Sequence, residues 1–211
     1  PRAVPPLAVL AALTPPGTGT LAEVGSMMRA VSGSDGWARD GRVWIVAMEY
    51  DTGRRVAFGR EGAPEARLDE AVTASCAIPG WYAPVLVDGK RYVDGGTLSA
   101  TSADLLAREG LDEVYVLAPM ASFVSDRPRQ VAARLERRLR RQVTRRLIRE
   151  AQAVSRGGAA VTILAPGPED LAEIGANLMD PRRRLAVLET SLRTSREALA
   201  EPSPDDLARM L

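Results

Sequence analysis

One aspartate of this chain stands where acid–base chemistry could occur. Asp94 follows Tyr92 and Val93, which end a short predicted strand, and it precedes Gly95 and Gly96. In an α/β sheet, functional side chains gather where a strand ends and turns into a loop or helix. Glycines carry no Cβ, so they allow a sharp turn and a close approach of another segment to the carboxylate. Taken alone, the motif favours a simpler role, in which Asp94 caps the next helix.

The composition excludes several other chemistries. The 211 residues contain no histidine and one cysteine, Cys76. A Ser-His-Asp triad, an internal disulfide and a Cys/His zinc site therefore cannot be assembled from this chain. We expect no metal and no organic cofactor. Because no histidine can activate Cys76, and because a lone cysteine on a helix face is typically a small buried hydrophobe, we expect Cys76 in the core.

Length and charge bound the class of protein. With 45% hydrophobic and 26% charged residues, the chain falls in the ordinary globular class, and we expect one domain over residues 1–211. No run of about 18 uncharged apolar residues occurs, so a membrane-spanning helix is not expected. Residues 1–16 are a poor secretory signal and, without an initiating Met, suggest a processed or truncated chain. We expect a cytoplasmic protein, with peripheral membrane contact left open.

Strands and helices alternate along the sequence. Two hairpins are predicted, one around Asp51–Gly53 and one around Asp88-Gly89, a dipeptide that tolerates the positive φ angles of a tight turn. Two more apolar runs read as buried strands, and the remaining segments show helical spacing. The pattern predicts an α/β sandwich with a mostly parallel central sheet flanked by helices. The expected strands are 42–50, 54–59, 83–87, 90–94, 112–120 and 160–166, and the expected helices are 64–78, 99–110, 126–155, 168–178 and 181–200.

The ordered block ASCAIPGWYAPVLVDGKRYVDGGTLSATSADLLAREGLDEVYVLAP resembles the patatin-like phospholipases. The resemblance covers about Arg42 to Met120, and residues 160–196 are similar to the tail of the bacterial branch of that family. It implies a three-layer α/β fold and lipid acyl ester hydrolysis by a Ser-Asp dyad, in which a serine in a G-x-S-x-G elbow attacks the ester. By the same resemblance, Asp94 is the general base and Gly95 and Gly96 form its turn.

The chain departs from the family pattern at the nucleophile. None of its serines lies in a G-x-S-x-G sequence, and the glycine-rich oxyanion turn is absent as well. We therefore expect the carboxyl-terminal portion of such an enzyme, inactive as given; the alternative is a non-catalytic lipid- or partner-binding module. Ser75 and Ser34 are disfavoured as replacement nucleophiles, since the first ends a helix and the second lies in a flexible type of loop.

Other polar and aromatic residues near the motif have simpler interpretations. Ser99, Thr101 and Ser102 stand where a helix is predicted to begin, so we expect them to cap it. Trp81 and Tyr82 precede the second hairpin, where they could either line an acyl-chain entrance or anchor the packing of the loop.

The predicted helix at 126–155 is rich in arginine, with ten arginines between Arg127 and Arg149. Its apolar residues recur every four positions, so we expect this stripe to pack on the sheet and the arginines to face solvent. Contact with an anionic membrane is the second interpretation. Nucleic acid is disfavoured, because Phe123 is the only aromatic residue after Tyr115 and no base-stacking platform exists. The expected apolar stripe is Val131, Leu135, Leu139, Val143 and Leu147.

A C-terminal helical part is expected at about 168–211.

Overall fold

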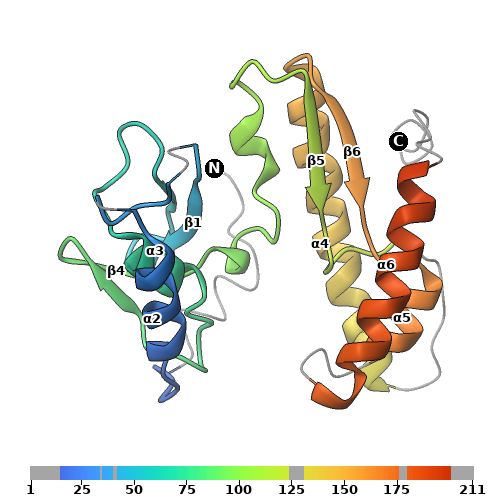
Figure 1. The fold of residues 1–211 in the computed structure, drawn as a ribbon, viewed down its shortest axis with the longest axis horizontal. Coiled ribbons are helices and arrows are strands. Elements are labelled where there is room, and N and C mark those ends of the chain that lie inside the picture. The colour runs from blue at the N-terminus through green and yellow to red at the C-terminus, as the bar shows by residue number, and fades with distance from the viewer. Residues whose placement is uncertain (1–14, 34, 40–41, 124–130, 176–179, 201–211) are drawn as a thin grey trace. The chain divides into compact units, whose positions relative to one another are not determined.

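The computed structural model describes residues 15–33, 35–39, 42–123, 131–175 and 180–200 (Figure 1). The chain divides into two compact units, residues 1–99 and 100–211, each with its own sheet. Several predictions lie outside the described residues: the opening segment up to residue 14, the first residues of the Arg-rich helix, and the end of the helix predicted at 168–178.

The first unit contains a four-stranded sheet in the order β2-β1-β4-β3, in which every pair of neighbours is antiparallel. Both predicted hairpins are confirmed. In the second, Asp88 and Gly89 adopt φ angles of 46° and 71°, as a two-residue turn with the twist of the strands requires. The strands are β1 (Ile45–Glu49), β2 (Arg55–Phe58), β3 (Val85–Val87) and β4 (Lys90–Asp94).

The prediction of a mostly parallel central sheet is wrong. A parallel pair needs a crossover connection of about a dozen residues or more, whereas the turns of both hairpins are far shorter. The only parallel pair described is β5 (Glu113–Leu117) with β6 (Ala160–Leu164), which form a separate two-stranded sheet in the second unit. Helix α4 (Val131–Arg156) is the crossover between them.

The core of the first unit lies between the sheet and helix α3 (Leu68–Ser75). Phe58 and Tyr92 meet there edge to face, with ring centroids 5.0 Å apart. At the centre of β1, Ala47 and Met48 point to opposite faces and are both buried, so this strand is covered on both sides, as its continuous apolar run 42–50 predicts. Sequence patterning missed a further helix, α2 (Ala22–Val31), because it contains Gly25, lacks a side-chain cap and buries little.

In the second unit, α4 packs on one face of the β5–β6 sheet. The side chains of Val131 and Leu135 lie outside the description. Of the other stripe residues, Leu147 is buried, whereas Leu139 and Val143 are only half-buried. The guanidinium of Arg140 is buried instead and donates to the Pro119 carbonyl over 2.9 Å. The buried Thr144 hydroxyl accepts the Ser122 amide and lies within hydrogen-bond distance of the Ser122 carbonyl. Because these polar contacts need Thr144 on the buried face, the helix turns that face toward the sheet. Among the residues of α4 whose side chains are described, the buried ones are Arg140, Thr144, Leu147, Glu150, Ala151 and Val154.

Two other predictions for this region need correction. The strand at 113–117 is buried on one face only, with Tyr115 56% and Leu117 72% exposed. The segment 99–110 forms no α-helix but only the short 3₁₀ turn η2 (Ala103–Leu106). Ser102, at φ 49°, leaves the helical region, and Glu150 takes the Ala103 amide, so a side chain competes successfully with helical hydrogen bonding.

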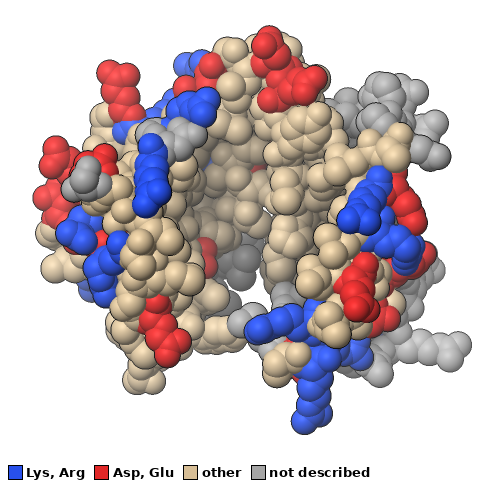
Figure 2. All heavy atoms as spheres, viewed as in Figure 1, with Lys and Arg blue, Asp and Glu red and all other residues tan. Residues whose placement is uncertain are grey.

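The C-terminal part contains α5 (Pro168–Ile174), η3 (Pro181–Arg183) and α6 (Arg184–Ala200). The buried carboxylate of Asp170 joins two of them, because it accepts the Gly167 amide and the hydroxyls of Ser191 and Thr194. Figure 2 shows acidic and basic side chains interspersed over the visible face of each unit, in keeping with a net charge of +1. Within the described residues, no helix has the length and apolar character needed to cross a bilayer.

Candidate functional site

Asp94 is the last residue of β4, where three elements of the first unit meet. Its Cα pairs with Ala47 of the adjacent strand β1. Its backbone amide donates to the carbonyl of Ala77, just beyond the end of α3, over 3.0 Å. The position of the carboxylate is therefore fixed by the sheet on one side and by the α3–β3 loop on the other.

The two glycines after Asp94 are required for space. Neither adopts the left-handed backbone conformation, so conformational freedom does not explain them. A Cβ on Gly95 would lie 2.4 Å from the carbonyl oxygen of Val46 in β1, and a Cβ on Gly96 would lie 2.9 Å from Oδ1 of Asp94. Gly95 thus lets the turn rest on the backbone of β1, and Gly96 lets its own amide reach the carboxylate.

The Asp94 carboxylate has one hydrogen-bond donor. Its Oδ1 accepts the Gly96 amide over 2.6 Å, which caps the 3₁₀ turn η1 (Gly95–Thr97). Among the described residues, no donor reaches Oδ2. The side chain is partly buried, and this burial raises the pKa of Asp94 above its ordinary value of 3.8, although the Gly96 amide opposes the shift. Capping and base chemistry are therefore compatible, since capping uses one oxygen only.

The residues at the end of α3 lie close to this carboxylate but are poor nucleophiles. The Ser75 hydroxyl donates to the Val46 carbonyl over 2.7 Å, so its proton faces a backbone acceptor. The prediction that Cys76 is buried is wrong: it is exposed, because the helix ends at Ser75 and the chain turns away from the buried face. The pKa of the Cys76 thiol is raised, first by desolvation and second by the charge of Asp94. Ser34 lies outside the described residues.

The polar residues after the glycine turn do not cap a helix in the predicted way. Ser102 precedes η2, but its side chain makes no capping hydrogen bond. The Thr101 hydroxyl instead donates to the buried carboxylate of Glu150 over 2.7 Å. The sequence predicts that Glu150 pairs with arginines of this helix, and the ion pair with Arg146 confirms it. The burial of Glu150 and its bonds to Thr101 and Ala103 were not predicted, because these partners are distant in sequence.

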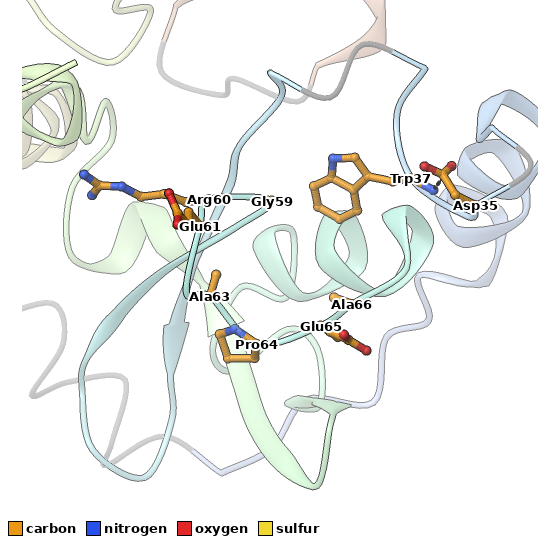
Figure 3. Close-up of a pocket in the computed structure, with 9 residues that line it drawn as sticks. All are labelled: Asp35, Trp37, Gly59, Arg60, Glu61, Ala63, Pro64, Glu65 and Ala66. Carbon is orange, nitrogen blue, oxygen red and sulfur yellow. Dashed lines mark hydrogen bonds between the residues drawn. The ribbon is translucent and has the colours of Figure 1, made fainter. Parts of the chain in front are cut away.

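A hollow of about 400 Å³ in the first unit does not include Asp94 (Figure 3). Figure 3 shows Trp37 and Asp35 on one side of this hollow and Arg60, Glu61, Ala63 and Pro64 on the other. A much smaller space, about 10 Å³, lies beside Val93 and Tyr82 and is too small for an acyl chain. Within the described part of the chain, no three His, Cys, Asp or Glu side chains are grouped so as to hold a metal ion.

Comparison with known proteins relates the stretch around Asp94 to a protein family. No curated protein matches the chain. The family model described as patatin-like phospholipase matches residues 38–107. The matched stretch contains all of the first sheet, α3, Asp94 and the glycine turn. Over residues 38–107 the chain is similar to the patatin-like phospholipase family.

Proposed function

We propose that the protein takes part in the hydrolysis of lipid acyl esters by a Ser-Asp dyad, with Asp94 as the general base. The observation that carries the proposal is the state of this carboxylate: it is partly buried, its pKa is raised, and its Oδ2 accepts no hydrogen bond from the described residues. The family match over residues 38–107 supports lipid esters as the substrate class.

In the proposed reaction, Asp94 accepts the proton of a serine hydroxyl while the serine oxygen attacks the ester carbonyl. The proton then passes to the leaving alcohol, and an acyl-enzyme remains. Water hydrolyses the acyl-enzyme in a second step: Asp94 accepts a proton from the water and passes it to the departing serine oxygen, which releases the fatty acid and restores both groups. A raised pKa makes the carboxylate a stronger base, and a Ser-Asp dyad requires no histidine, metal or organic cofactor.

We propose that the nucleophilic serine lies in a G-x-S-x-G segment outside these 211 residues. None of the serines of this chain has that context, and Ser75, which lies close to the site, already donates its hydroxyl to Val46. These two observations also favour the second candidate, a non-catalytic lipid- or partner-binding module. On either account, the 211 residues alone are expected to hydrolyse no ester.

The upstream reading frame separates the two candidates, because a G-x-S-x-G sequence there supports the enzyme. The extended protein is then assayed with p-nitrophenyl acyl esters as Asp94→Asn and as Asp88→Asn. Asp88 is a matched control, since it also precedes a glycine but lies exposed in a hairpin turn. We expect turnover to fall by about 10²-fold or more for Asp94→Asn and to stay unchanged for Asp88→Asn. Equal turnover in both variants removes Asp94 from the mechanism.

We also propose that the Arg-rich helix contacts anionic membranes. The side chains of Arg138, Arg141, Arg145 and Arg149 are exposed on α4 and offer positive charge to lipid head groups. Flotation with anionic and neutral vesicles tests this contact, and equal binding to both vesicle types rejects it.

A further inference from the structure

The loop between α3 and β3 presents its two neighbouring aromatic residues in opposite directions. Tyr82 packs inward beside Val93, Pro79 and Pro84. Trp81 is 60% exposed and Ile78 is 41% exposed. The stretch from Cys76 to Val87 contains no charged residue. This uncharged stretch therefore exposes three large apolar side chains: Ile78 and Trp81 in the loop, and Leu86, which is 65% exposed, in β3.

Hydrogen bonds hold the backbone of this loop in place. The amides of Trp81 and Tyr82 both donate to the Ile78 carbonyl, over 3.1 and 3.0 Å, and Gly80 turns the chain at a φ of 83°. On the other side, the Gly19 amide donates to the Trp81 carbonyl over 2.9 Å. The exposed position of the indole is thus set by a pinned backbone.

The packing beneath the loop is equally tight. A Cβ on Gly17 would lie 2.0 Å from the carbonyl carbon of Trp81, and one on Gly19 would lie 2.7 Å from both the Trp81 oxygen and the Tyr82 ring. Only glycine allows the segment 17–19 to run so close to the loop. This segment packs against the backbone of Trp81, so the Trp81 side chain is directed away from it and into solvent.

We propose that Trp81 and Ile78 insert into the surface of a lipid layer and dock the first unit there. An indole has a large apolar body and a polar N–H, and for this reason tryptophan concentrates at the boundary between lipid and water. The absence of charge from Cys76 to Val87 removes the desolvation cost that a charged loop would incur.

The same loop is joined to the candidate base by a backbone hydrogen bond. The Ala77 carbonyl, next to Ile78, accepts the backbone amide of Asp94. Docking of the loop would therefore bring the Asp94 carboxylate to the lipid surface, where ester substrates lie. The purpose of the docking rests on the proposed function, but the docking itself is measured as binding, without any turnover.

The test uses neutral phosphatidylcholine vesicles, so that attraction of the arginines to anionic lipid does not contribute. Flotation compares the native chain with Trp81→Ala and with the matched control Leu192→Ala, which removes a 51% exposed apolar side chain from α6. We expect the vesicle affinity to fall by about tenfold or more for Trp81→Ala, because most of the buried apolar area on docking comes from the indole. Leu192→Ala is expected to bind as the native chain does.

A spectroscopic readout reports on Trp81 itself. The difference in emission between the native chain and Trp81→Phe isolates Trp81 from Trp37 and Trp44. We expect this difference spectrum to shift to the blue with vesicles, and acrylamide to quench it less. An unchanged spectrum, or an indole already shielded from acrylamide without vesicles, overturns the proposal, the latter because another part of the chain or a second copy then covers the loop. Vesicle binding that persists in Asp94→Asn separates docking from catalysis.

Discussion

Each of the two units contains a carboxylate that is at least partly buried, and the two differ greatly in the hydrogen-bond donors that they receive. In the second unit, Glu150 is 4% exposed and accepts hydrogen bonds from the Thr101 hydroxyl, the Ala103 amide and the Arg146 guanidinium. In the first unit, the partly buried carboxylate of Asp94 receives the Gly96 amide alone among the described residues. One carboxylate is surrounded by donors and a positive charge, and the other is left with an unused oxygen.

The difference indicates which carboxylate is structural. A buried charge is costly unless hydrogen bonds and an opposite charge compensate it, and Glu150 has both. Its three partners tie α4 to the segment at the start of the second unit. Within the described part of the chain, Asp94 has no such compensation beyond the Gly96 amide, and its raised pKa marks a carboxylate held at some cost to stability. Groups of this kind cluster at functional sites.

The largest effect is expected from removing the structural carboxylate. In Glu150→Ala, Arg146, Thr101 and the Ala103 amide lose their common acceptor, and we expect the free energy of unfolding to fall by about 3 kcal/mol. Glu150→Gln keeps one carbonyl oxygen and is expected to lose about half as much. Urea unfolding measures both. A loss below about 0.5 kcal/mol in Glu150→Ala would show that this carboxylate does not hold the unit together.

A somewhat smaller effect is expected at the turn that supports Asp94. Gly95→Ala forces a Cβ against the Val46 carbonyl, a backbone atom that cannot move aside without shifting β1, and we expect a loss of about 2 kcal/mol. Gly96→Ala meets only the Asp94 side chain, so its loss should be about 1 kcal/mol or less. Thermal unfolding of the two variants provides the comparison. If Gly96→Ala proves the more damaging, the close approach to β1 is not the reason for Gly95.

The smallest effect is expected from neutralising the candidate base. Since the pKa of Asp94 is raised in the folded state, the folded state binds a proton more tightly than the unfolded state does, and stability falls as pH rises through the folded pKa. Asp94→Asn removes this dependence. Relative to the native chain, the variant should gain stability between pH 3 and pH 7. A relative loss over that interval would mean that the ionised form of Asp94 is stabilised by folding.

Local sequence signals predicted the hairpins of the first unit well, but they did not predict the direction of its sheet or the rotation of α4 in the second unit. The turn at Asp88-Gly89 specifies its hairpin through backbone angles alone, so the sequence was sufficient there. The position of Asp94 at a strand end also followed from local pattern. The rotation of α4 did not, because Arg140 and Thr144 are buried through hydrogen bonds to Pro119 and Ser122, which are distant in sequence and give no apolar periodicity.

The candidate site shows the same limit. The groups that contact the Asp94 turn include the backbone carbonyls of Val46 and Ala77. Every residue has such a carbonyl, so the residue type does not reveal this role. The need for glycine at position 95 was visible, but its physical reason, contact with β1, was visible only in three dimensions. The exposure of Cys76 depended on the residue at which α3 ends, which is the least predictable feature of a helix.

The most direct test of the central claim is the titration of the aspartate side-chain carboxyls by nuclear magnetic resonance. Hydrogen bonds from Arg91 lower the pKa of Asp51, and those from Arg29 and Arg67 outweigh burial and lower the pKa of Asp69. Asp94 should titrate above 3.8, and Asp51 and Asp69 should titrate below it. A pKa of Asp94 at or below that of Asp69 would contradict the account. The carboxylate would then be stabilised as a helix cap and would be too weak a base for the proposed role.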